Sequence, residues 1–106
     1  MWRGEIWWVD FDPAVGEEIQ KVRPAVIVSN NVFNKNLNRL QVVPITTSVD
    51  KVYPGEVLVS VNGQSQKAMA NQISTVSKLR VSKRMGTILK SDLKRVETAI
   101  KFQLGM

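Results

Sequence analysis

Cysteine and histidine are both absent from this chain of 106 residues. Without cysteine, neither a disulfide framework nor a thiolate metal site can form, and the chain is compatible with a reducing compartment. Without histidine, the chain lacks the usual general base near neutral pH and the commonest metal ligand. Any hydrolytic enzyme built from this sequence must therefore work without imidazole.

Long apolar runs, nucleotide-binding loops and clustered carboxylates are also missing. No segment reaches the length of a membrane span, and the N-terminal MWRGEIWW is not a basic-then-apolar leader, so we expect a cytoplasmic protein with no membrane partner. The Walker and GxGxxG motifs are absent, which excludes the common nucleotide hydrolases and dinucleotide enzymes. Among the scattered acidic residues only Asp10 and Asp12 share a face at strand spacing, so we expect no metal and no cofactor.

Positive charge is what the sequence has in excess. Fifteen Lys and Arg residues against nine Asp and Glu leave a net charge of +6. Such a balance favours nucleic acid or another polyanion as a partner, although the charge can equally serve solubility alone. The length and the 43% hydrophobic content predict a single globular domain over residues 1–106.

Short segments rich in β-branched residues alternate with turn signals over most of the chain. Asn30 and Asn31 are suitable N-cap residues before one or two helical turns, with Val32, Phe33 and Leu37 facing inward. The sequence NGQ at 62–64 indicates a tight turn between two strands. The expected strands are Gly4 to Phe11, Pro24 to Ser29, Leu40 to Thr46, Gly55 to Val61, Lys67 to Val76 and Arg84 to Leu89.

The last part of the chain changes from strand to helix spacing. Leu93, Val96, Ile100 and Leu104 recur at helical intervals, so we expect an amphipathic helix from Ser91, as N-cap, to about Leu104. Five to seven short strands with one covering helix predict a mainly β fold, a small barrel of antiparallel strands with accessory helices.

Arg23 lies at the boundary between the charged loop GEEIQK and the apolar run PAVIV. An arginine at such a junction is most often a surface ion-pair partner. Its alternative use is to bind an anion, because a planar guanidinium presents paired N–H donors to phosphate oxygens. Thr46 and Thr47 at the end of a strand have the same two interpretations, since strand-end threonines are commonly satisfied by local hydrogen bonds.

Two further groups of residues also have alternative interpretations. Lys78, Arg80, Lys83 and Arg84 either follow a phosphate backbone or form a solvated turn. Trp7 and Trp8 lie on opposite faces of the first strand, which favours core and dimer packing over stacking on bases.

Three segments, GEEIQKVRP, VPITTS and ANQISTVSK, together resemble the MazF/PemK family of toxins from bacterial toxin–antitoxin pairs. The likeness extends from GEIWWVDFDP through RPAVIVS to the C-terminal helix, in the family's order and spacing. It implies a compact SH3-like barrel and metal-independent cleavage of single-stranded RNA. It also implies a homodimer, an antitoxin whose acidic, disordered tail covers the RNA groove, and DNA binding together with that antitoxin.

The resemblance assigns roles to particular residues of this chain. Arg23 and Thr46 stand where the family has its catalytic arginine and threonine, and Glu18 stands at the loop glutamate. Attack by the 2′-hydroxyl would leave a 2′,3′-cyclic phosphate and a 5′-hydroxyl, with the group that takes the first proton left open. The residues expected to contact RNA are Lys21, Gln20, Thr47, Ser48, Lys51 and Gln72.

Two segments depart from the family's pattern. Residues 19–22 are Ile-Gln-Lys-Val where many members have glycines, and Ser74 stands where many have arginine. We expect this stiffer, more basic loop to affect which RNA sequences are preferred more than it affects the cleavage chemistry. The rival function is a non-catalytic nucleic-acid-binding module, or a gyrase-targeting toxin, on the same fold, because fold alone does not separate these classes.

Overall fold

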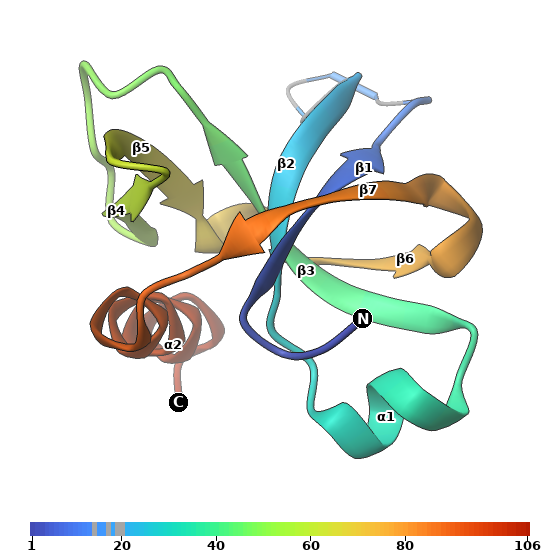
Figure 1. Cartoon of the computed structure of the whole chain (residues 1–106). Coiled ribbons are helices and arrows are strands. Elements are labelled where there is room, and N and C mark those ends of the chain that lie inside the picture. The colour runs from blue at the N-terminus through green and yellow to red at the C-terminus, as the bar shows by residue number, and fades with distance from the viewer. Residues whose placement is uncertain (14, 17, 19–20) are drawn as a thin grey trace.

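The computed structural model describes residues 1–13, 15–16, 18 and 21–106, and Figure 1 shows the course of the chain. Within these residues there are seven strands, two α-helices and two 3₁₀-helices. In chain order they are β1 (Glu5–Asp10), β2 (Val22–Ile27), α1 (Asn31–Asn36), β3 (Arg39–Thr46), β4 (Glu56–Val61), β5 (Gln64–Met69), η1 (Ala70–Gln72), β6 (Ser74–Ser77), η2 (Lys78–Arg80), β7 (Val81–Thr87) and α2 (Lys90–Leu104).

The strands form one antiparallel sheet in the order β4-β5-β3-β2-β1-β7, with β6 also pairing with β3. β3 is the central strand, because β2 pairs along one edge while β5 and β6 share the other edge. Among the described residues no pairing joins the outer strands β4 and β7, so the sheet is open although it folds around the core (Figure 1). The mainly β fold with a C-terminal helix is therefore confirmed.

The segment predicted as one strand from Lys67 to Val76 is two strands in the structure. β5 pairs with β3 at Ile45 and Thr46, and β6 pairs with it from Arg39 to Val42. Between them η1 takes the chain out of the sheet and returns it to the same edge of β3. The alternation of residues along the chain does not predict this interruption, because the interruption arises from pairing with β3, a strand that is distant in the sequence.

Two apolar layers cover the two faces of the central strands. Trp7, Val9 and Phe11 face one layer and Ile6 faces the other, as the alternation in the first strand predicted. The larger layer packs beneath α2 and contains Ile6, Val26, Val28, Val43, Ile45, Val59, Val61, Ala68, Ile88 and Val96. The smaller layer contains Val9, Ala25, Ile27, Leu40, Val42 and Val76.

The C-terminal helix α2 is confirmed, but its start differs from the prediction. Leu89 occupies the N-cap position and offers no capping side chain, whereas Ser91 lies inside the first turn. The Asp92 carboxylate is buried there and accepts a hydrogen bond from the Ser60 backbone N–H at 2.9 Å. The start of the helix is thus set by a tertiary contact with β4 instead of by a local cap.

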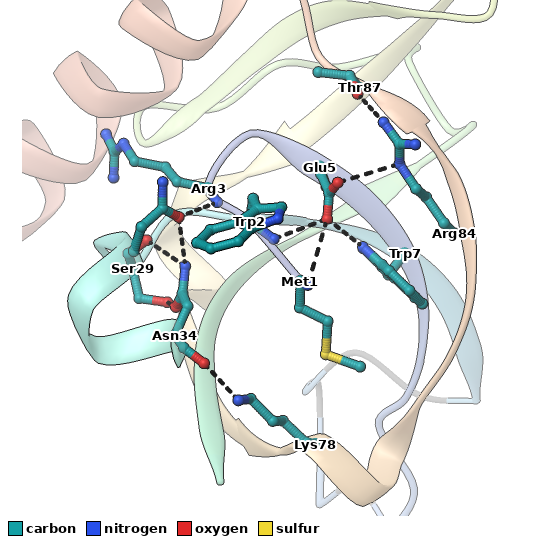
Figure 2. Close-up of polar contacts among 11 residues, drawn as sticks. Met1, Trp2, Arg3, Glu5, Trp7, Ser29, Asn34, Lys78, Arg84 and Thr87 are labelled. Carbon is teal, nitrogen blue, oxygen red and sulfur yellow. Dashed lines mark hydrogen bonds and ion pairs between the residues drawn. The ribbon is translucent and has the colours of Figure 1, made fainter. Parts of the chain in front are cut away.

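The short helix α1 is capped by Asn30, as predicted, with its side chain accepting a hydrogen bond from Phe33 N–H at 2.8 Å. Of the three positions predicted to face inward, Phe33 is half-buried, whereas Val32 and Leu37 are exposed. Asn34 is buried instead, and its amide donates to the Ser29 carbonyl at 2.9 Å (Figure 2). Lys78 Nζ donates to the Asn34 carbonyl, which ties the helix to η2.

Glu5 at the start of β1 connects the N-terminus, β1 and β7 (Figure 2). Its carboxylate accepts hydrogen bonds from Trp2 N–H at 2.8 Å and from Trp7 Nε1 at 3.1 Å, and lies 3.4 Å from Arg84 Nε. Burial raises the pKa of this carboxyl, but the two hydrogen bonds and the positive charges of the N-terminus and Arg84 together lower it below its ordinary 4.5.

Because the pKa of Glu5 is lower in the folded chain, the Glu5 carboxylate stabilises the fold above about pH 4.5, and this contribution is lost as the pH falls through the folded pKa. We expect Glu5→Gln to lower the free energy of unfolding by about 1.5–3 kcal/mol at pH 7. The difference between wild type and variant should shrink as the pH falls below about 4.5, measured by urea unfolding from pH 3 to 7. A difference independent of pH would contradict this role.

Candidate active site

Arg23 and Thr46 lie side by side where β2 and β3 meet. The strands pair antiparallel with Ala25 opposite Pro44, and the same register continued by two residues places Arg23 opposite Thr46. Because the two sheet faces carry different buried layers, this register is fixed by the core, and a slip of one residue would exchange the layers. The core thus fixes the strand register that brings Arg23 and Thr46 to the wall of one pocket.

A pocket of about 210 Å³ opens at this point and is called here the Arg23 pocket. Strands β1, β2, β3, β5 and β7 all contribute to its wall, although their residues are far apart in the sequence. It is lined by Trp8, Val22, Arg23, Pro24, Ile45, Thr46, Thr47, Gln66 and Met85. One cation and two hydroxyl groups therefore face a cavity with otherwise mostly apolar walls.

Thr46 is half-buried and its Oγ1 accepts a hydrogen bond from Ser48 N–H at 3.2 Å. A hydroxyl that accepts this bond still carries a proton to donate, so it can serve an anion in the pocket. Arg23 is also half-buried and lies within β2, since the strand begins one residue before it. A side chain carried by a paired strand is held more precisely than one carried by a loop.

Glu18, the third predicted catalytic residue, does not line the Arg23 pocket. It is exposed, and its Oε1 accepts a hydrogen bond from Val15 N–H at 2.7 Å within the same loop. The structure therefore brings Arg23 and Thr46 into one pocket, whereas the Glu18 side chain is bonded within its own loop.

The residues predicted to contact RNA are distributed around this region. Thr47 lines the pocket, whereas Ser48 and Lys51 are exposed in the loop between β3 and β4. Lys21 is exposed with φ 66, and its N–H donates to Asp12 Oδ1 at 2.9 Å. Gln72 is half-buried in η1 and is not part of the pocket wall. Gln20 lies outside the described residues.

Six residues that line the pocket were not predicted as parts of the site: Trp8, Val22, Pro24, Ile45, Gln66 and Met85. Trp8 is half-buried and lines the pocket, so the same side chain both packs in the fold and forms part of the site. Gln66 is only 6% exposed, and Met85 comes from β7 at the far edge of the sheet. The alternation within β1 gave a signal for Trp8 alone, because Gln66 and Met85 reach the pocket only through long-range strand pairing.

The basic cluster near residue 80 is largely engaged in intramolecular bonds. Arg80 donates to the carbonyls of Asp10 and Asp12, and Arg84 donates to Thr87 Oγ1 at 2.7 Å. These contacts favour the structural interpretation of the cluster over a phosphate-binding track.

Two larger cavities lie elsewhere on the molecule. One of about 580 Å³ is lined by residues 54–57 and by one side of α2, and one of about 410 Å³ lies around Asp92 and Arg95. Arg95 lines both, with Thr98 in the first cavity and with Ser60 and Ser65 in the second, so neither size nor a cation beside hydroxyl groups identifies the site here. The Arg23 pocket is the candidate because it gathers two of the residues, Arg23 and Thr46, to which the family resemblance assigns catalysis. In the part of the chain that the structure describes, no group of three acidic side chains is placed to hold a metal ion. No described helix is long and apolar enough to cross a membrane.

Comparison with known proteins agrees with the resemblance seen in the sequence. The family described as PemK-like, MazF-like toxin of type II toxin–antitoxin system matches residues 2–104. Endoribonuclease MazF9 of Mycobacterium tuberculosis is 39% identical over 115 residues, covering 100% of this chain and 98% of that protein. Endoribonuclease toxin MazF of Escherichia coli is 33% identical over 103 residues, covering 96% of this chain and 92% of that protein.

Solved structures show the same fold. A crystal structure of MazF from Deinococcus radiodurans superposes with a TM-score of 0.89 at 25% identity, over 100% of this chain and 97% of that one. An endoribonuclease in complex with its cognate antitoxin from a mycobacterial species superposes with a TM-score of 0.84 at 22% identity, over 100% and 96%. This chain therefore belongs to the PemK-like, MazF-like family of toxins from type II toxin–antitoxin systems.

Proposed function

We propose that this protein is a metal-independent endoribonuclease toxin of the cytoplasm that cuts single-stranded RNA at short specific sequences. The observation that carries the proposal is the juxtaposition of Arg23 and Thr46 in one pocket at the end of β3. The endoribonuclease names of MazF9 of Mycobacterium tuberculosis and MazF of Escherichia coli support the reaction class.

RNA supplies its own nucleophile, the 2′-hydroxyl beside the scissile phosphate, so the protein needs only to align the reacting atoms and stabilise charge. The 2′-oxygen loses its proton to a base and forms a bond to phosphorus, while the bond from phosphorus to the 5′-oxygen breaks and the 5′-oxygen takes up a proton from solvent. The products are a 2′,3′-cyclic phosphate and a 5′-hydroxyl, and no water oxygen or metal ion enters this step.

Arg23 binds the non-bridging phosphate oxygens, on which negative charge grows during attack. Its N–H donors match the geometry of two such oxygens, and the β2 backbone holds them in place. Thr46 adds a hydroxyl donor to the same oxygens and is no nucleophile, because the chain has no histidine to deprotonate it.

Glu18 is the carboxylate proposed to receive the proton of the 2′-hydroxyl. Its Oε1 accepts a hydrogen bond from Val15 N–H, and a carboxylate has a second oxygen and further lone pairs with which it can receive the substrate proton. A carboxylate is a weak base, and catalysis therefore depends more on charge stabilisation by Arg23 than on proton abstraction.

The remaining assignments concern binding. Lys21 and Lys51 contact the phosphate backbone and Gln20, Thr47, Ser48 and Gln72 contact bases or sugars of the RNA. The net charge of +6 suits both RNA and the acidic, disordered tail of a cognate antitoxin, which would cover the same surface. The toxin acts as a homodimer with RNA running across it.

The first test compares RNA with DNA. Purified protein in EDTA should cut labelled single-stranded RNA and leave the same strand with deoxyribose intact, because DNA lacks the attacking hydroxyl. The cut ends are identified by mass spectrometry. Cleavage that EDTA abolishes would contradict metal independence, and tight RNA binding without any cleavage would indicate the rival binding module.

The second test concerns the Arg23 guanidinium. Arg23→Ala should lower kcat by roughly a hundred- to a thousandfold, the usual effect of removing one preorganised donor to a transition-state oxyanion. Arg23→Lys should recover only part of this loss, since lysine keeps the charge but not the paired donors. Both are measured by single-turnover cleavage.

Arg39→Ala is the matched control, because it removes an equal charge from the exposed, opposite end of β3. Equal losses in the Arg23→Ala and Arg39→Ala variants would mean that Arg23 contributes only general positive charge.

The third test separates the two neighbouring threonines. Thr46→Val should lower kcat roughly ten- to a hundredfold, the value of about 1.5–3 kcal/mol for a hydrogen bond to a charged group, while Thr46→Ser restores most of the rate. Thr47→Val should instead raise KM, because Thr47 is assigned to binding. Identical kinetic effects of the two valine variants would contradict these separate roles.

A further inference from the structure

Lys67 is a lysine almost completely buried in the middle of the sheet. It lies on β5, directly opposite Thr46 of β3 and Leu58 of β4, and is 7% exposed. Lysine is almost never fully buried unless its charge is paired. Its partner is Glu56, whose Oε1 lies 3.2 Å from Lys67 Nζ, with side chains only 9% and 7% exposed for Lys67 and Glu56.

The buried pair also binds the loop of residues 47–55, which joins β3 to β4. Lys67 Nζ donates to the Lys51 carbonyl at 2.9 Å, and Glu56 Oε1 accepts from Tyr53 N–H at 2.9 Å. The ring of Tyr53 lies over the ammonium with its centroid 6.0 Å away. The two charged groups therefore hold the loop at two points, one from β5 and one from the start of β4.

Stability alone gives no reason for this arrangement. A buried ion pair is often replaceable by apolar residues of similar size without loss, because the cost of desolvating two charges offsets their attraction. Lys67 and Glu56 differ from a simple ion pair in that each also bonds loop backbone. Directional bonds from a fixed point define a loop conformation, which apolar contacts do less well.

The anchored loop begins at the Arg23 pocket. Thr47, its first residue, lines the pocket, and Ser48 and Lys51 follow on its exposed side. Lys67 therefore holds the chain at two points, Thr46 and Lys51. The Lys67 backbone pairs with Thr46, and the Lys67 ammonium donates to the Lys51 carbonyl. A single residue thereby connects the end of β3 to the loop of residues 47–55, through its backbone at one point and through its side chain at the other.

We propose that Lys67 and Glu56 are positioning residues for base recognition. Their buried ion pair fixes the loop of residues 47–55, and the fixed loop decides which bases are accepted beside the scissile phosphate. This inference rests on the proposed endoribonuclease function and adds the determinant of its sequence selectivity. Neither residue touches the reacting atoms.

The test replaces the pair by apolar residues of similar length, Lys67→Met with Glu56→Leu, so that no unpaired charge stays buried. Hydrogen exchange at the Tyr53 amide should become faster, because its acceptor is removed. On a long transcript, the ratio of kcat/KM between the preferred and the next-ranked cut sites should fall by about tenfold, the usual range for losing one specific contact, with the loss mainly in KM.

Arg3→Met with Glu97→Gln is the matched control, since it removes an ion pair of 2.6 Å that joins the N-terminal segment to α2. It should change the melting temperature but not the cut-site profile. If the apolar double variant does not unfold cooperatively, Lys67→Met with Glu56→Gln carries the test. It leaves no charge buried without a partner and keeps an acceptor for Tyr53 N–H while removing the bond to the Lys51 carbonyl, so a smaller shift of the cut-site profile in the same direction is expected.

The outcomes separate this inference from the proposed function. A folded apolar double variant with the wild-type cut-site profile, or with unchanged exchange at Tyr53, would overturn the positioning role while leaving the endoribonuclease intact. For Lys67→Met with Glu56→Gln, which keeps the acceptor, the cut-site profile alone decides. A wild-type protein that cuts no RNA would overturn the proposed function itself.

Discussion

The pairing of β2 with β3 is the constraint on which the rest of the structure depends. Both strands are buried on both faces, one side by the layer beneath α2 and the other by the smaller layer with Val9 and Leu40. Because successive side chains alternate between these layers, only one register satisfies both. Continued by two residues beyond its last pair, that register brings Arg23 and Thr46 to the wall of one pocket. Hydrophobic packing therefore sets the position of the two polar groups that the proposed chemistry uses.

Reaction without histidine places particular demands on such a site. An imidazole can move a proton, whereas a guanidinium contributes fixed charge and directed donors. A fixed charge stabilises a transition state best when its position is preorganised before the substrate binds. A cation on a paired strand meets this requirement better than one on a loop. The walls of the Arg23 pocket from Trp8, Ile45 and Met85 limit the water around that cation, and electrostatic interactions are stronger where water is excluded.

Chemistry and recognition are assigned to different parts of the molecule. Strand ends carry Arg23 and Thr46, whereas loops carry the residues proposed to contact RNA. Loops vary more easily than paired strands, so one reaction can be combined with many sequence preferences. The buried pair of Lys67 and Glu56 gives the loop of residues 47–55 some of the rigidity of the sheet, although that loop has no strand partner of its own.

The sequence by itself determined most of the strands, the C-terminal helix and the Asn30 cap, because alternation, helical spacing and capping act over a few neighbouring residues. Through its resemblance to the MazF/PemK family it also predicted Arg23 and Thr46. Only the tertiary structure decided the break at η1, the cap at Leu89 in place of Ser91, and the gathering of Trp8, Gln66 and Met85 around Arg23. The buried Lys67 was likewise invisible in the sequence, where a lysine normally indicates surface. Each of these features comes from contacts between strands that are distant along the chain, and no local pattern encodes them.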